Sequence, residues 1–348
     1  MKQVQLALVV PWHVHTRMFL KAIRETFGDA VTFPWVYDHK PERGRPFAEL
    51  LGAKFTDNYD DVLADPAVDA IMCESETCLH RDLLVRAARA GKHVYTDKCL
   101  ATTTADGLAI KEAVETAGVK FCVSHESLPT AAYVLAKRFA DEGKLGDIVS
   151  VYFRRAHGMA KAKNPAFGLP ADWFDKTVAG GGALIDLGVH GLSMLPYIAG
   201  TPKSVACVTH CFTGSATEDS ATILVEFENG AQGTAHTDMV TNTLENLFEI
   251  VGTEGQLCVV SWRGNEQVYL TSTRVPGCED KLTLLPPDTL GSDQPVPVCQ
   301  FLRLLLEDAP ETSIPGFDFD MGLTVTRLAE AAYEAAETGR AVAFDKRW

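Results

Sequence analysis

The chain has 348 residues, of which 46% are hydrophobic and 22% charged, and its formal net charge at pH 7 is −14. This length suffices for two domains with sizeable cores, and the acidic balance disfavours nucleic acid or an anionic membrane as a main partner. No apolar run reaches about 18 residues, so the sequence predicts no membrane-spanning helix.

The start of the chain and its cysteines predict a cytoplasmic location. Residues 3–10 read directly as a strand, without the basic and apolar segments of a secretory leader. The nine cysteines are scattered and form no CxxC pair, which favours reduced and mostly buried thiols.

The first third of the chain alternates expected strands with expected helices. Such alternation is typical of a doubly wound parallel sheet, so residues 1–124 are predicted to form an α/β Rossmann-type domain of the dinucleotide-binding kind. Ligands of such sheets bind beyond the carboxyl ends of the strands. The expected strands are 3–10, 31–37, 70–74, 92–96 and 119–124, and the expected helices begin at residue 16 and cover 80–90 and 103–116.

Residues 125–348 show a different pattern, in which strands follow one another without helices between them. This run predicts a C-terminal α+β domain with an open, mostly antiparallel sheet for substrate binding and oligomerisation. Glu228-Asn229-Gly230 indicates a hairpin turn, and a final helix at 320–339 is expected to pack back on the first domain. The expected strands are 148–155, 204–212, 221–228, 231–236, 245–252, 256–260 and 267–273, with a helix at 180–198 and a surface loop at 284–297.

The turn after the first strand lacks the glycines that a dinucleotide site normally needs. It reads Pro11-Trp12-His13-Val14-His15, and no glycine occurs between Met1 and Gly28. Glycines in this turn let the backbone approach a pyrophosphate, whereas a side chain such as that of Trp12 would stand where the phosphates lie. The helix that begins at Thr16 still offers free backbone N–H groups to an anion.

Two longer motifs resemble those of the glucose-fructose oxidoreductase/inositol dehydrogenase/MocA family. Residues 90–101, AGKHVYTDKCLA, resemble the family's AGKHVxxEKPLA stretch, and residues 180–190, GGGALIDLGVH, resemble its GGGxLxDxGxH helix. Weaker similarities lie at 142–146, 227–230, 252–255 and 331–340. Their order along the chain matches the family, so the resemblance covers essentially the whole sequence and implies the fold described above.

The resemblance implies a hydride transfer between NAD(P) and a CH–OH carbon of a sugar, sugar derivative or cyclitol. Carried over by motif position, Lys98, Asp186 and His190 are the expected catalytic residues. Lys98 and His190 would handle the proton of the substrate hydroxyl, and Asp186, four residues before His190 on one helical face, would orient that imidazole. A homodimer or homotetramer formed through the second sheet is also implied.

The expected cofactor-binding residues lie at the carboxyl ends of the first-domain strands. They are Pro11, Trp12, His13, Asp38, Glu76 and Asp97. Val10, Trp12 and His15 align with the three family glycines, and Asp97-Lys98-Cys99 replaces the family's Glu-Lys-Pro. An acid such as Asp38 binds ribose hydroxyls and favours NAD over NADP, although the residue can equally be a strand-end turn residue.

An alternative hypothesis uses the residues that replace the glycines. His13, His15, His125, Glu126 and His190 could converge on Zn²⁺ or Mn²⁺. Such an ion would support a non-redox lyase, hydratase or isomerase acting on a keto-sugar. Alternatively, the two histidines of the turn bind a substrate or cofactor phosphate, or cap the following helix.

A third hypothesis is a catalytically inactive family member that binds a sugar or a partner, but the retained catalytic motifs argue against it. The substrate pocket has five further candidates, each of which is at least as compatible with a structural or interface role: Arg154, Arg155, His157, Trp173 and Phe174.

Overall fold

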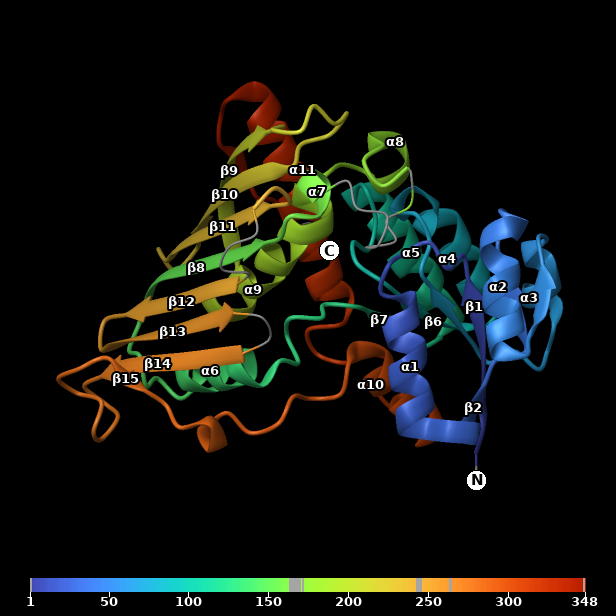
Figure 1. Cartoon of the computed structure of the whole chain (residues 1–348), viewed down its shortest axis with the longest axis horizontal. Helices are drawn as coiled ribbons and strands as arrows, with labels where there is room; N and C mark the ends of the chain where they lie inside the picture. The colour runs from blue at the N-terminus through green and yellow to red at the C-terminus, as the bar shows by residue number, and fades with distance from the viewer. Residues whose placement is uncertain (1, 163–169, 171, 242–245, 263–264, 347) are drawn as a thin grey trace.

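The structure is a computed structural model, and it describes all residues except 1, 163–169, 171, 242–245, 263–264 and 347. It consists of a parallel α/β unit and a large, mostly antiparallel sheet, which lie side by side in Figure 1. The predicted fold class is confirmed.

The first unit is built on a parallel sheet with the strand order β4-β3-β1-β5-β6-β7, and β2 also pairs with β1. The central strands are buried on both faces, as parallel strands covered by helices require. The strands are β1 (Val4–Val9), β2 (Val31–Thr32), β3 (Trp35–Tyr37), β4 (Lys54–Thr56), β5 (Ala70–Cys73), β6 (His93–Thr96) and β7 (Phe121–Val123).

One predicted strand was too long. The stretch 31–37 is divided into β2 and β3, because Pro34 lacks the N–H that a continuous ladder would use.

Helices connect these strands, and three elements between the second and third predicted strands were missed. They are α2, β4 and α3. Pro46 and Gly44 lie inside α2 and obscured its helical pattern, although Pro41 at its start and Gly52, with φ of 65°, at its end are typical helix boundaries. The helices of this unit are α1 (Thr16–Phe27), α2 (Pro41–Leu51), α3 (Tyr59–Ala64), α4 (His80–Arg89) and α5 (Thr104–Ala117), with short turns η1 (Gly28–Ala30) and η2 (Thr77–Leu79).

The second unit is a nine-stranded sheet with the order β15-β14-β13-β12-β8-β11-β10-β9-β16. Within this sheet, β8 and β11 form the only parallel pair among the pairings of the described residues. Residue 245, predicted to begin a strand, lies outside the described residues. The strands are β8 (Ile148–Ala156), β9 (Pro202–His210), β10 (Ser220–Phe227), β11 (Gln232–Asp238), β12 (Asn246–Gly252), β13 (Gly255–Trp262), β14 (Asn265–Ser272), β15 (Thr283–Leu284) and β16 (Val342–Ala343).

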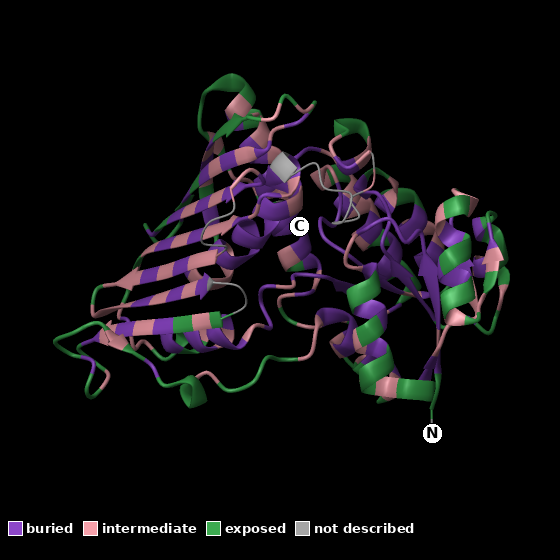
Figure 2. Ribbon diagram, viewed as in Figure 1, coloured by how far each residue is buried: buried purple, intermediate pink, exposed green. Residues whose placement is uncertain are grey.

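Helices cover the face of this sheet that is directed toward the first unit (Figure 1). Buried and mainly intermediate positions alternate along the strands (Figure 2), and the outer face includes the exposed Val208, at 69%, and Leu224, at 53%. The helical elements of this part are α6 (Ala131–Asp141), which was not predicted, α7 (Met159–Ala162), α8 (Lys176–Ala179), the π-helical turn η4 (Leu184–Gly188) and α9 (Val189–Ala199).

The stretch Lys176–Ala199 is long and apolar enough to cross a membrane, but 83% of its most apolar window is buried inside the protein. It therefore behaves as a core helix that packs against β8 and β11.

The C-terminal helices pack on both units. In α11 (Phe319–Thr338), the Phe319 ring stacks on Phe121 of β7 with 3.7 Å between centroids, while the helix also packs on β9. In α10 (Pro297–Leu306), a helix that was not predicted, the Phe301 ring lies 5.9 Å from that of Tyr95. The predicted loop before α10 contains the short turn η5 (Pro287–Thr289). Residues assigned from the sequence to the second domain thus complete the core of the first.

Candidate active site

A cavity of about 210 Å³ lies where the strand ends of the first unit meet η4 and α9 of the second. The turn after β1, the residues after β6 and the start of α9 all contribute to it, so the crevice expected from the parallel topology is present. Its lining residues are Val14, His15, Lys98, Arg155, His157, Met159, Trp173, Asp186, Leu187, His190 and Met239.

Two glycines hold η4 against its neighbours. A Cβ atom on Gly182 would lie 1.9 Å from the backbone oxygen of Glu218, and one on Gly181 would lie 1.8 Å from the hydroxyl of Tyr333. The Glu218 carboxylate accepts hydrogen bonds from the Gly182 N–H at 2.9 Å and from the Tyr333 hydroxyl at 2.8 Å. The glycine motif therefore permits the close packing that fixes Asp186 and His190 at the cavity.

Lys98 and Asp186 form a buried ion pair across the two units. The Lys98 Nζ atom lies 2.7 Å from Asp186 Oδ1 and also donates to the Asp186 backbone oxygen at 2.6 Å. Burial opposes both charges, but the pKa of Lys98 is raised by Asp186 and Asp97, and the pKa of Asp186 is lowered by Lys98 and His13. Lys98 is therefore an ammonium ion at neutral pH.

His190 is held by Ser127 rather than by Asp186. Its Nδ1 atom lies 3.1 Å from Ser127 Oγ, which also accepts from Arg155 at 3.1 Å. The predicted orienting role of Asp186 is therefore wrong, because the ammonium of Lys98 binds that carboxylate instead. Burial, followed by the charges of Arg155 and Lys98, places the pKa of His190 well below its usual value, so the ring is neutral.

Two imidazoles and two carboxylates meet beside this ion pair. Asp97 Oδ2 lies 2.8 Å from His13 Nδ1 and 2.9 Å from His15 Nδ1, and Glu126 Oε1 lies 2.5 Å from His15 Nδ1. Burial would raise the pKa of Asp97, but the two histidines lower it well below its usual range. Burial would lower the pKa of His15, but Glu126 and Asp97 raise it to about 9. We call these four residues the imidazole–carboxylate cluster.

The predicted metal-ligand set is only partly brought together. His13, His15 and Asp97 have potential ligand atoms that all lie within 4.8 Å of one another. His190 instead bonds Ser127, and His125 is a buried residue whose Nε2 atom has no hydrogen-bond partner. Burial lowers the pKa of His125 to about 4. Asp97, predicted as a cofactor residue, therefore replaces His125 and His190 in the cluster.

The backbone N–H groups of the turn between β1 and α1 are already hydrogen-bonded within the protein. The buried Val10 has a φ of +50°, a strained value for a β-branched residue. After the buried Pro11, the backbone N–H groups of Trp12 and His13 donate to the Glu74 carbonyl at 3.2 and 2.9 Å. These amides are therefore not directed toward a phosphate.

The Trp12 side chain is covered by a segment of the second unit. Its indole is 5% exposed and stacks on Trp173, with 4.5 Å between centroids and 16° between planes. Its Nε1 atom donates to Asp172 at 2.9 Å, and Lys40 bonds the same carboxylate at 3.0 Å. In this conformation the residues do not fit the pyrophosphate of a dinucleotide bound in the usual way.

Asp38 and Glu76 both form ion pairs with Arg43. The guanidinium contacts the two Asp38 carboxylate oxygens at 2.6 and 2.8 Å and Glu76 Oε1 at 2.8 Å. Asp38 Oδ1 also accepts from the Lys40 N–H at 2.9 Å. Asp38, which the sequence predicted as a ribose acceptor, is therefore paired with Arg43 from the unpredicted helix α2, and Glu76, predicted as a cofactor-binding residue, contacts the same guanidinium.

Three of the five substrate-pocket candidates line the cavity: Arg155, His157 and Trp173. Arg154 projects from the other face of β8, as alternation along a strand requires, and lies 3.6 Å from Asp238. Phe174 packs beside Leu187 and Met239. Sequence reasoning missed Ser127, Met159 and Met239, since no motif marks them.

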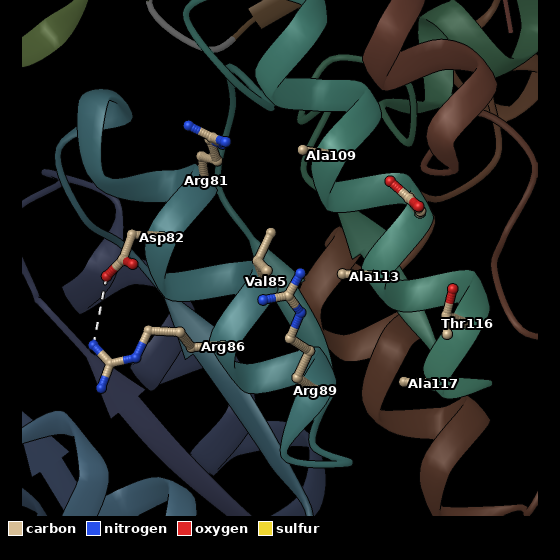
Figure 3. A pocket seen from close by; sticks show the side chains of 10 residues that line it. Arg81, Asp82, Val85, Arg86, Arg89, Ala109, Ala113, Thr116 and Ala117 are labelled. Carbon is tan, nitrogen blue, oxygen red and sulfur yellow. Dashed lines mark hydrogen bonds and ion pairs between the residues drawn. The ribbon is translucent and has the colours of Figure 1, made fainter.

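A larger hollow, about 740 Å³, is a groove between α4 and α5. Figure 3 shows Ala109, Ala113 and Ala117 along α5 on one side of it and Arg81, Arg86 and Arg89 along α4 on the other. None of the predicted site residues lines it.

Two family models match the chain. The description "Oxidoreductase family, NAD-binding Rossmann fold" covers residues 13–125, and "GFO/IDH/MocA C-terminal domain" covers residues 133–258. Together they span most of both units.

Among curated proteins, the chain is 29% identical over 240 residues to 1,5-anhydro-D-fructose reductase of Ensifer adhaerens, covering 68% of the chain and 69% of that protein. It is 28% identical over 250 residues to levoglucosan dehydrogenase of Pseudarthrobacter phenanthrenivorans, covering 64% and 63% of the two chains, slightly less than two thirds of the relative. Among solved structures, GenD2 from gentamicin A biosynthesis in complex with NAD superposes with a TM-score of 0.81 at 25% identity, over 99% and 97% of the two chains.

Proposed function

This chain belongs to the GFO/IDH/MocA oxidoreductase family, and we propose that it is an NAD(P)-dependent oxidoreductase acting on a CH–OH group of a sugar, sugar derivative or cyclitol. The Lys98–Asp186 ion pair and the neutral His190, which face one cavity at the carboxyl ends of the strands, carry this assignment. The named activities of the curated relatives support the same substrate class.

Within the cavity, each residue has a distinct part in the chemistry. The Lys98 ammonium stabilises negative charge that develops on the substrate oxygen, which is the usual role of a fixed cation near a reacting oxygen. His190 accepts the hydroxyl proton at Nε2 in the tautomer that donates from Nδ1 to Ser127. Asp186 keeps Lys98 charged and in place. A bound nicotinamide would supply the hydride acceptor or donor.

The phosphate end of the crevice distinguishes this chain from a standard dinucleotide site. Cofactor binding requires Asp172 and Trp173 to leave Trp12, because the closed turn and the stacked indole occupy the usual route. We infer that the cofactor binds only to the form in which this contact is broken.

The choice between NAD and NADP depends on Asp38 and Arg43. A free acid at this position repels a 2′-phosphate and favours NAD, as the sequence predicts. Arg43, at 2.6 to 2.8 Å, neutralises that carboxylate. We therefore propose that NAD is preferred only weakly, and parallel titrations with NADH and NADPH measure the preference.

The test is a calorimetric titration of the purified protein with the four nicotinamide cofactors, followed by an absorbance assay at 340 nm. The substrates are 1,5-anhydro sugars, aldoses and inositols. Binding of one cofactor below millimolar concentration, with substrate-dependent turnover, supports the assignment. If no cofactor binds at millimolar concentration, the assignment is wrong.

A second candidate function is a non-redox, ion-assisted reaction on a keto-sugar. The imidazole–carboxylate cluster favours it, since His15 also lines the cavity. Product formation without added nicotinamide and without a change at 340 nm would distinguish it from the first candidate.

We also propose that the protein is a cytoplasmic homo-oligomer that associates through the outer face of its large sheet. All nine cysteines are free thiols, which suits a reducing compartment. The exposed Val149, Val208 and Leu224 give that face apolar area to bury. Light scattering of the purified protein measures the oligomeric state, and a Leu224→Lys variant would shift it toward the monomer.

A further inference from the structure

The H-x-H turn that replaces the glycine loop is not explained by hydride transfer. His13 and His15 place their rings 4.2 Å apart on the turn between β1 and α1. Asp97 follows β6 and Glu126 follows β7, so three strand ends deliver the four members of the imidazole–carboxylate cluster to one point. This convergence is produced by the order of the strands in the sheet.

The ring nitrogens of His13 and His15 lie within hydrogen-bond distance of more polar atoms than their hydrogens and lone pairs can serve. His15 Nδ1 faces Asp97 Oδ2 at 2.9 Å and Glu126 Oε1 at 2.5 Å, but one ring N–H cannot point at both. His13 Nδ1 accepts the backbone N–H of His15 at 3.2 Å while it lies 2.8 Å from Asp97 Oδ2. Glu126 Oε1 and the buried His13 Nε2 have no hydrogen-bond partner. One of the two contacts of His15 Nδ1 therefore has no hydrogen between its heavy atoms.

The local charge balance is also negative, because the Asp97 and Glu126 carboxylates share one imidazolium, that of His15. Asp97 is 1% exposed and the Glu126 side chain 12% exposed. The neighbouring Lys98 is already paired with Asp186. Buried carboxylates require a compensating cation or hydrogen bonds, and the imidazoles here cannot supply enough of the latter.

We propose that His13, His15 and Asp97 bind a divalent transition-metal ion, with Glu126 as the nearest further ligand, at the edge of the substrate cavity. Two imidazoles and one or two carboxylates form a donor set typical of Zn²⁺, and related ions such as Mn²⁺ or Co²⁺ accept the same donors. In a tetrahedral zinc site with bonds of 2.0 to 2.1 Å, ligand atoms lie about 3.4 Å apart, so the cluster would open by about 0.5 to 0.9 Å.

The surroundings suit such an ion. The backbone N–H of Lys98 donates to Asp97 Oδ1 at 2.8 Å, which fixes the carboxylate, and Asp186 Oδ1 lies 3.7 Å from His13 Nε2. Outer partners of this kind orient metal-binding side chains. Since His15 lines the cavity, the ion has an open side from which a sugar oxygen can reach it and be polarised.

The experiment measures metal binding directly and does not depend on nicotinamide or on turnover. Full-length, tag-free protein is stripped with a chelator, dialysed against Zn²⁺, Mn²⁺ or Co²⁺, and examined by elemental analysis and by thermal denaturation. We expect about one ion per chain for at least one metal, with a raised melting temperature.

Variants test the assigned ligands. H13Q, H15Q and D97N should each weaken metal affinity by more than about 100-fold, because loss of an outer partner alone costs about 10- to 100-fold. His157→Gln is the matched control, since His157 lines the same cavity but lies outside the cluster. This variant should retain the ion.

If the ligand variants fail to fold, the visible absorption of the Co²⁺-loaded wild-type protein shows whether the metal site exists. Ligand-field bands that disappear on addition of excess Zn²⁺ support the site. Wild-type protein that retains less than about 0.2 equivalents of every ion tested overturns the proposal, as does equal metal affinity in H13Q and the wild type. Neither result affects the nicotinamide assignment, which is measured separately.

Discussion

The contact that covers Trp12 predicts that weakening it will strengthen cofactor binding. Three interactions hold Asp172 and Trp173 against the turn. A stacked aromatic pair contributes about 0.5 to 1.5 kcal/mol, the hydrogen bond from Trp12 Nε1 to Asp172 about 1 kcal/mol, and the partly exposed Lys40–Asp172 ion pair at most about 1 kcal/mol. Together they favour the closed form by about 1.5 to 3.5 kcal/mol.

If only the open form binds NADH, this closure weakens the apparent affinity by about 10- to 400-fold. Asp172→Ala removes the acceptor of the indole N–H and the partner of Lys40, and it should therefore tighten NADH binding by about 5- to 30-fold. Trp173→Ala removes the stack and should give a smaller increase, but it also alters the cavity wall.

Calorimetric titration with NADH measures both dissociation constants. Glu337→Ala is a suitable control, because it removes an exposed ion pair with Lys176 of α8 without touching Trp12. A dissociation constant for Asp172→Ala that is equal to or weaker than that of the wild type would refute the reasoning, since the covering segment would then not compete with the cofactor.

Three other predictions concern buried charges. Arg43→Met leaves Asp38, which is fully buried, without its ion-pair partner and should lower the free energy of unfolding by about 3 to 5 kcal/mol, whereas Arg45→Met should have little effect; urea denaturation compares them. Lys98→Met should reduce kcat by about 10²- to 10⁴-fold with a native circular dichroism spectrum, and a kcat near that of the wild type would exclude Lys98 from the chemistry. Burial would raise the pKa of Asp238, but hydrogen bonds from His236, Thr241 and two backbone amides lower it to about 2. Its stabilisation of about 2 kcal/mol is present above pH 4 and disappears as the pH falls through 2, so the stability difference between Asp238→Asn and the wild type should shrink across that range in denaturation curves.

Much of the fold could be read from local patterns. Strand–helix alternation, turn residues and the order of the family motifs determined the two-part architecture. The hydrophobic residues of a strand or a helix repeat with a period of 2 or 3.6, and this repeat is visible within a short stretch of sequence. Gly44 and Pro46 interrupt the helical pattern of the missed helix α2, whereas the missed helix α10 directly follows the predicted proline-rich loop.

The sequence also identified Lys98, Asp186 and His190 as neighbours of one cavity, since each lies within a long motif. It determined as well that the turn after β1 carries histidines instead of glycines. What a polar side chain binds was decided only by the tertiary structure. Arg43 meets Glu76 across 33 positions, and Asp97 meets His13 across 84. Such pairs depend on which strands are adjacent in the sheet and on which charged side chain lies closest to each partner. Neither property is visible in the local spacing of residues.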